Sequence, residues 1–189
     1  MFHLVYPRRY LSKFIVLTCF TQSRFPMPTL ALINGHAFAG GFMVAMMHDY
    51  RIMNPSRGFL CLPELHMGIP FQPAMISIFR EKLSALTFRK LVLEAQRYRA
   101  PDALKDGIID GLGGFEEALA FARTIGLPGF GDTRVYGELK KEMWPVTLGN
   151  LDVAIHGDEV DAETVKRRER EVKESGVTSW EGKEGRPKL

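Results

Sequence analysis

Short apolar runs alternate with turns in the first part of the chain. Residues 29–33 (TLALI) are wholly apolar and lie between a proline and an Asn-Gly pair, which is the pattern of a strand buried on both faces. Residues 42–48 (FMVAMMH) are apolar all round and predict a buried helix. Residues 50–53 (YRIM) and 58–62 (GFLCL) predict two further strands. This alternation at short intervals predicts an α/β fold.

From residue 72 onward the spacing of apolar residues becomes helical. The predicted helices cover residues 74–83, 85–95, 100–105, 115–125, 134–143 and 161–174. Ser84 is placed to cap the second of them. Residues 108–110 predict one more strand, and residues 127–132 a loop. The last helix, 161–174, carries charges on all sides, which indicates a solvated surface.

Length and composition suit a core with a helical appendage: 189 residues, of which 46% are hydrophobic and 25% charged. We divide the chain into a basic lead-in (1–25), a core (26–125), a helical section (126–175) and a mobile polar tail (176–189). The lead-in contains no acid. A basic, acid-free start is typical of a mitochondrial presequence, but its amphipathic period is poor, and we favour a poorly structured segment.

Charge, the length of the apolar runs and the cysteine spacing argue against a nucleic-acid partner, a membrane span and a metal site. The net charge is +3, and basic and aromatic residues do not gather into a nucleic-acid face. The apolar run at residues 14–20 is too short to span a bilayer. Cys19 and Cys61 form neither a metal spacing nor a disulfide framework, which favours a reducing compartment. We therefore expect no nucleic-acid partner, no membrane span and no metal.

A turn that is almost bare of side chains leads into the buried helix. Residues 35–41 read GHAFAGG. Such a turn exposes backbone N–H groups at the helix N-terminus, where the helix dipole also favours negative charge. The pattern is neither G-x-G-x-x-G nor a Walker loop. Close packing of strand and helix explains it equally well.

One acid, Glu64, lies in the predicted loop after strand 58–62. It is the only Asp or Glu between residues 50 and 79, and its neighbours are apolar. Such surroundings raise the pKa of a carboxyl group toward the range that a general base needs. The alternative is a structural acid at a strand end, paired with Arg57 or Arg80.

The run NGHAFAGGFMVAMMHDYRIM, followed by FLCLPELHMGI, resembles the crotonase superfamily, the enoyl-CoA hydratase/isomerase family. The matching features are the Asn-Gly turn, Ala39-Gly40-Gly41, Asp49 at the helix end, Pro63-Glu64 and the later segment 103–110. The resemblance covers roughly residues 26–125. It implies a partial crotonase fold, an acyl-CoA substrate, no cofactor and a homo-oligomer, which in this family is a trimer.

The same resemblance implies the site residues. The N–H of Gly40 is one donor of an oxyanion hole for the thioester oxygen, Glu64 is the catalytic base, and Gly41, Met43 and Met67 contact substrate. Hydratases of the family carry a second glutamate where this chain has Met43. One carboxylate is enough to move a double bond from position 3 to position 2, so the resemblance favours an enoyl-CoA isomerase of fatty-acid β-oxidation.

Two alternatives stay open. The first is an enoyl-CoA hydratase. The second is a truncated, non-catalytic homologue that acts only in oligomer assembly, because the family's other oxyanion donor and much of its CoA surface come from an N-terminal portion that residues 1–25 do not match. The C-terminal Pro187-Lys188-Leu189 resembles a peroxisomal Ser-Lys-Leu address, and we prefer the peroxisome over the mitochondrion.

Overall fold

The computed structural model describes residues 18–19, 21, 23–131 and 134–156. The chain divides into two compact units, Met1–Ile155 and His156–Leu189. All the described elements belong to the first unit, except for the last residue of the final helix. The expected helix over 161–174 and the polar tail lie outside the described residues. None of the described helices is long and apolar enough to cross a membrane.

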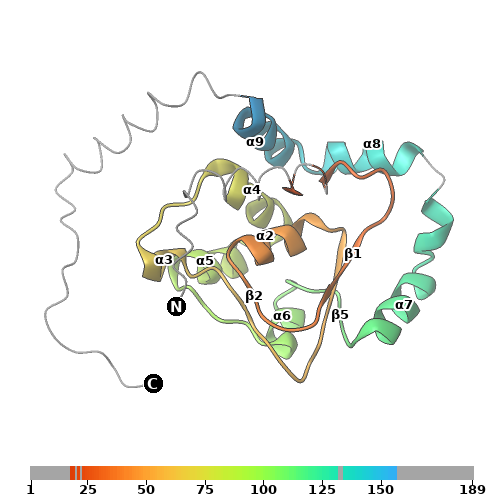
Figure 1. Cartoon of the computed structure of the whole chain (residues 1–189), viewed down its shortest axis with the longest axis horizontal. Helices are drawn as coiled ribbons and strands as arrows, with labels where there is room; N and C mark the ends of the chain where they lie inside the picture. The colour runs from red at the N-terminus through yellow and green to blue at the C-terminus, as the bar shows by residue number, and fades with distance from the viewer. Residues whose placement is uncertain (1–17, 20, 22, 132–133, 157–189) are drawn as a thin grey trace, which may run out of the picture. The chain divides into compact units, whose positions relative to one another are not determined.

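Two small parallel sheets form the centre of the first unit (Figure 1). The larger sheet has the order β1 (Leu30–Ile33), β3 (Tyr50–Met53) and β5 (Gly111–Leu112). The smaller sheet pairs β2 (Ala37–Phe38) with β4 (Leu60–Cys61). Parallel neighbours require a crossover, and the helix between β2 and β3 supplies it. The predicted α/β class is therefore confirmed.

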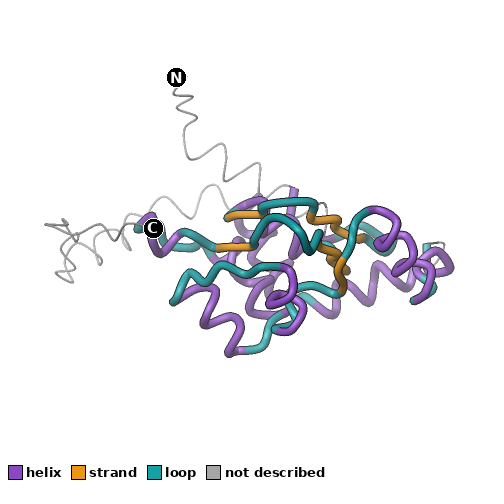
Figure 2. Tube along the Cα trace, turned by 90° about the horizontal axis from the view of Figure 1, so that it is seen from below, coloured by secondary structure: helices purple, strands orange, loops and turns teal. Residues whose placement is uncertain are grey.

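Helices cover the strands (Figure 2). On one face, α2 (Gly40–Met47) joins the hydrophobic cluster that also contains Ile33 of β1 and Met53 of β3. On the other, α7 (Phe115–Thr124) packs on β1 and β5, and the rings of Phe121 and Tyr50 lie 5.6 Å apart. β3 is buried at three of its four residues, as a strand covered on both faces should be. β1 is buried only at Ile33, and Leu32 is 36% exposed, so the expectation of burial on both faces is not met there.

The other helices follow the predicted spacing closely. The expected cap is present, since the Ser84 hydroxyl accepts a hydrogen bond from the N–H of Thr87 at 3.1 Å. The remaining described helices are α3 (Glu64–Met67), α4 (Pro73–Lys82), α5 (Ala85–Leu93), α6 (Ala100–Lys105), the 3-10 turn η1 (Leu127–Phe130), α8 (Arg134–Met143) and α9 (Pro145–His156).

Five elements differ from the sequence expectation. β2 forms within the turn expected at residues 35–41, and η1 forms within the loop expected at residues 127–132. Glu64 begins the short helix α3 rather than lying in a loop, and the last strand is at 111–112 rather than 108–110. The sequence analysis predicted no helix over 145–156. There Pro145 begins α9, a position that suits proline, and the Glu81 carboxylate accepts the N–H groups of Val146 and Thr147 at 3.3 and 2.9 Å.

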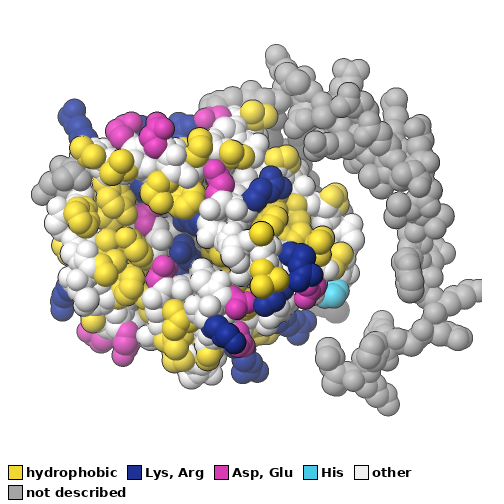
Figure 3. All heavy atoms as spheres, turned by 180° about the vertical axis from the view of Figure 1, so that it is seen from behind, with side chains coloured by type: hydrophobic (Ala, Val, Ile, Leu, Met, Phe, Trp, Pro, Cys, Tyr) yellow, Lys and Arg dark blue, Asp and Glu magenta, His cyan; other side chains and the backbone are white. Residues whose placement is uncertain are grey.

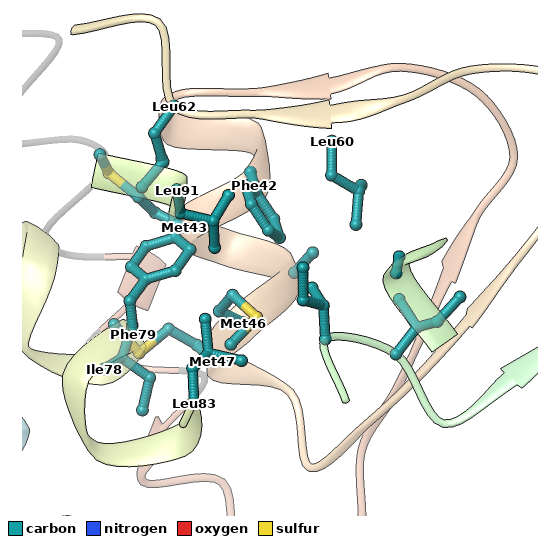
Figure 4. Packing of buried hydrophobic residues seen from close by; sticks show 14 of the residues in the cluster. Phe42, Met43, Met46, Met47, Leu60, Leu62, Ile78, Phe79, Leu83 and Leu91 are labelled. Atoms are coloured by element: carbon teal, nitrogen blue, oxygen red, sulfur yellow. The ribbon is translucent and has the colours of Figure 1, made fainter. Parts of the chain in front are cut away.

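The core is centred on α2, as its apolar sequence predicts. Phe42 and Phe79 are fully buried and meet edge to face at 5.0 Å. Figure 4 shows Met46 and Met47 of the same helix packed toward α4. Cys19 is also in this cluster, although the sequence analysis placed it in a poorly structured lead-in. That segment is thus packed at its end.

The C-terminal end of α2 is fixed by charged side chains. The Lys82 ammonium donates to the carbonyls of Met46 and His48 at 2.7 and 2.6 Å, where the helix dipole favours a positive charge. Asp49 Oδ2 accepts from the N–H and hydroxyl of Thr29 at 2.8 and 2.9 Å and from Lys140 Nζ at 3.0 Å. These contacts tie β1 and α8 to the end of α2.

Candidate functional site

The smaller sheet brings the predicted oxyanion donor and the predicted base to the same end. β2 and β4 are parallel, with Phe38 and Cys61 as Cα partners at their carboxyl ends. Gly40 follows β2 and Glu64 follows β4 within a few residues. Between them, the N–H of Ala39 donates to the Cys61 carbonyl at 3.1 Å. Ligands of parallel α/β sheets bind beyond the carboxyl ends of strands, and both groups lie there.

Backbone donors gather at the start of α2. The Met43 N–H, which bonds the Ala39 carbonyl at 2.9 Å, belongs to the fourth residue of the helix. The N–H groups of Gly40, Gly41 and Phe42 precede it and have no acceptor within the helix. No acid occupies the first turn. This end of α2 therefore offers an uncompensated positive dipole to a developing negative charge.

Glu64 is a buried acid, and one oxygen of its carboxylate has no partner in the described part of the chain. Its residue exposure is 7%, and Oε2 has no hydrogen-bond partner among the described residues. Burial raises the pKa of this carboxyl group above its ordinary value, and a hydrogen bond with the N–H of the same residue offsets this in part. Buried polar atoms are normally paired, so the unpaired Oε2 marks Glu64 as a candidate functional group.

The alternative partners of Glu64 are engaged elsewhere. The Arg57 guanidinium donates to Asn34 Oδ1 at 2.8 Å, and the Arg80 guanidinium lies 5.8 Å from the centre of the Phe88 ring. Neither forms an ion pair with Glu64 in the residues that the structure describes. The hypothesis of a paired strand-end acid therefore has no support in this geometry.

The three predicted substrate contacts lie in different surroundings. Met43 is 2% exposed and belongs to the core cluster with Leu62 and Phe79 (Figure 4). Met67, on α3, is 59% exposed. Gly41 lines an open groove beside β1. The structure does not bring these three residues together, and their contact with substrate stays a prediction.

That groove is the feature that the sequence analysis missed. It has a volume of about 670 Å³ and runs along β1, the turn at residues 34–38 and one face of α2 that includes Val44 and His48. β1 and β2 are both edge strands in the described sheets, so the groove follows two open strand edges. It depends on how β1 packs against α2, which no local pattern encodes.

Two other reactive side chains are engaged in contacts of their own. Burial raises the pKa of the Cys61 thiol, whose Sγ faces the Ala95 carbonyl. Burial lowers the pKa of His48, whose Nδ1 lies 2.9 Å from the Val44 carbonyl.

Within the described residues, no group of three or more His, Cys, Asp or Glu side chains could hold a metal ion. On the face in Figure 3, charges of both signs are interspersed with hydrophobic side chains.

Comparison with solved structures defines the fold class. The structure of a probable enoyl-CoA hydratase, ECHA3, from Mycobacterium tuberculosis aligns with a TM-score of 0.72 at 17% identity, covering 89% of this chain and 71% of that one. An enoyl-CoA hydratase/isomerase family protein from Pseudomonas syringae aligns with a TM-score of 0.70 at 22% identity, covering 82% and 69%. The architecture is that of the crotonase fold.

The sequence comparisons identify the family. The family model for enoyl-CoA hydratase/isomerase matches residues 16–123, and the chain belongs to this family. Two relatives from Arabidopsis thaliana are enoyl-CoA delta isomerase 1, peroxisomal (34% identical, covering 62% of this chain and 51% of the relative), and enoyl-CoA delta isomerase 3 (30% identical, covering 68% and 56%). The chain thus spans about half the length of the curated relatives it matches.

Proposed function

We propose that this chain is an enoyl-CoA isomerase that moves a 3-enoyl-CoA double bond to position 2. The observation that carries the proposal is the buried carboxylate of Glu64, whose Oε2 has no partner among the described residues. It lies at the same sheet end as the N–H of Gly40, which has no acceptor within its helix. Family membership supports an acyl-CoA substrate. The names of the Arabidopsis relatives support the isomerase branch.

In the proposed reaction, ionised Glu64 takes a proton from C2 of the 3-enoyl thioester. The electron pair moves toward the thioester oxygen, and the resulting dienolate is stabilised by the Gly40 N–H and the dipole of α2. Protonated Glu64 then returns its proton to C4, which leaves the double bond between C2 and C3. One such N–H donor contributes about 2.7–4 kcal/mol to transition-state stabilisation. Because only a proton moves, the reaction needs no redox cofactor.

Hydration is the alternative within the family, and the surroundings of Met43 argue against it. Adding water across a double bond uses two carboxylates that hold one water molecule. The side chain at position 43 is apolar and lies in the core, so it supplies no second carboxylate. The non-catalytic alternative rests on the other finding, that the chain spans only about half of its relatives' length.

Turnover assays separate the three hypotheses. We expect the purified chain to convert a 3-enoyl-CoA into its 2-enoyl isomer and to leave crotonyl-CoA unhydrated, with chromatography of the thioesters as the measurement. Hydration of crotonyl-CoA would establish the hydratase instead. Calorimetry with an acyl-CoA tests the third hypothesis. A folded chain that neither isomerises nor binds acyl-CoA is the non-catalytic homologue. A trimer mass in solution would then support a role in oligomer assembly.

We further propose that the chain acts in the peroxisome, whereas the homo-oligomer that the family resemblance implies stays a prediction. The support is the word peroxisomal in the name of one relative, enoyl-CoA delta isomerase 1, and the terminal Pro187-Lys188-Leu189. A fluorescent protein fused ahead of the full chain is expected to colocalise with a peroxisomal marker and to lose this pattern when the last three residues are deleted. Mitochondrial fluorescence of a fusion that leaves the N-terminus free would favour the presequence.

A further inference from the structure

The residue that joins β2 to α2 adopts a backbone conformation that is unusual for its type. Ala39 has φ 45° and ψ −120°. These angles are close to those of the first central residue of a type II′ turn, the mirror image of type II, where glycine is favoured. A residue with a side chain is strained there and keeps the conformation only when its surroundings over-determine it.

Two hydrogen bonds hold Ala39 in place. Its N–H donates to the Cys61 carbonyl of β4 at 3.1 Å, and its carbonyl accepts from the Met43 N–H of α2 at 2.9 Å. The Ala39 carbonyl and the Gly40 N–H belong to one planar, trans peptide group, so they point in opposite directions. Since the carbonyl points into the helix toward Met43, the Gly40 N–H must point out of its N-terminal end.

We infer that Ala39 is a positioning residue for the proposed isomerase. Its left-handed conformation turns the chain from β2 into α2 so that the Gly40 N–H faces the position of the thioester oxygen. The bond to Cys61 also connects this donor to β4, the strand that leads to Glu64. The inference rests on the proposed function, because the direction of the Gly40 N–H matters only if that group binds an oxyanion.

A second alanine provides a matched control. Ala95 also has a positive φ, of 46°, and its carbonyl faces Cys61 Sγ. It lies just beyond α5, where the following N–H, that of Gln96, donates to the Lys90 carbonyl. Ala95 therefore shares the positive φ and the neighbour Cys61, but it aims no free N–H group at the site.

The experiment compares valine and glycine at both positions by isomerase kinetics and thermal unfolding. Valine is branched at Cβ and disfavours a positive φ, so Ala39→Val is expected to turn the Gly40 peptide and lower kcat by about 10²-fold with little change in KM. Ala39→Gly, which removes the side chain that is strained at this φ, is expected to raise Tm by about 2–4 °C. Ala95→Val is expected to lower Tm alone, and Ala95→Gly to leave kcat unchanged.

Several outcomes would overturn this role. Ala39→Val with normal kcat shows that the turn is only structural, and equal losses of kcat in Ala39→Val and Ala95→Val show an indirect effect through β4. If Ala39→Val does not fold, Ala39→Leu, which lacks the β-branch, is compared with Ala95→Leu in the same way. A folded wild-type chain without isomerase turnover rejects the proposed function and this role together, whereas an active wild type with an active Ala39→Val rejects this role alone.

Discussion

Replacing Glu64 with glutamine is expected to lower isomerase turnover by about 10²–10⁴-fold, the usual contribution of a positioned general base. Glutamine has nearly the same shape but cannot accept the C2 proton. Because Oε2 of Glu64 has no partner among the described residues, replacing that oxygen breaks no hydrogen bond that the structure shows for it. Thioester chromatography of single-turnover reactions measures the loss.

The same substitution is expected to change the pH dependence of stability in a defined direction. Burial raises the pKa of folded Glu64 above its ordinary value, so the folded state holds this proton more tightly than the unfolded state. The contribution to stability is complete at low pH and is lost as the pH rises through the raised pKa. We therefore expect Glu64→Gln to be more stable than the wild type above that pKa, by urea unfolding.

The pH dependence of turnover should report the same Glu64 carboxyl group, but in the opposite direction, because turnover should rise with pH where stability falls. Only the ionised carboxylate can act as a base, so wild-type kcat/KM is expected to rise with pH and to level off above the raised pKa of Glu64. Glu94, which is about half exposed and paired with Arg89 at 3.0 Å, provides the control. If Glu94→Gln and Glu64→Gln behave alike in turnover and stability, Glu64 is not the base.

The helices and strands that were predicted correctly are those whose local sequence pattern has one dominant physical cause. The four-residue strand 50–53 and the helices 100–105 and 134–143 were predicted at their observed bounds, because apolar period and turn residues agree there. α9 was not predicted, because a proline such as Pro145 suits both the residues after one helix and the first turn of the next. The cap that Glu81 provides for α9 comes from α4, far away in sequence.

The candidate site was only partly predictable for the same reason. Gly40 and Glu64 stand out in the sequence as a bare turn and a lone acid, and parallel pairing of β2 with β4 places both at one sheet end. The burial of Met43 and the exposure of Met67 depend on the direction of each side chain on its helix. The groove along β1 depends on tertiary packing. Neither the directions of these side chains nor the groove has a local sequence signal.

The largest loss of stability is expected from Lys140→Met. Lys140 and Asp49 form an ion pair at 3.0 Å whose side chains are only 4% and 10% exposed. The variant leaves the Asp49 carboxylate buried without its positive partner, with only neutral donors from Thr29 and Tyr136. Removing one partner of a buried pair costs about 3–5 kcal/mol, and the free energy of unfolding in urea measures it.

The neighbouring lysine is a matched control. Lys141 pairs with Glu138 at 2.8 Å, but their side chains are 44% and 71% exposed, and exposed pairs contribute only about 0.2–1 kcal/mol. Lys141→Met should therefore lose far less stability than Lys140→Met. In the double variant Asp49→Asn/Lys140→Met, the loss should be smaller than the sum of the single losses by about 0.5–3 kcal/mol. Equal losses in the two lysine variants would contradict a buried, coupled pair.

The position of this pair also predicts what should not change. Asp49 follows the C-terminal end of α2, whereas Gly40 begins the helix. Breaking the contact between α8 and Asp49 weakens the attachment at the C-terminal end of α2. It leaves the backbone N–H donors at the N-terminal end of α2 in place. Well below its unfolding midpoint, Lys140→Met is therefore expected to retain the wild-type kcat per folded molecule. A fall in kcat as large as that of Glu64→Gln would instead show that docking of α8 fixes the orientation of α2 at the site.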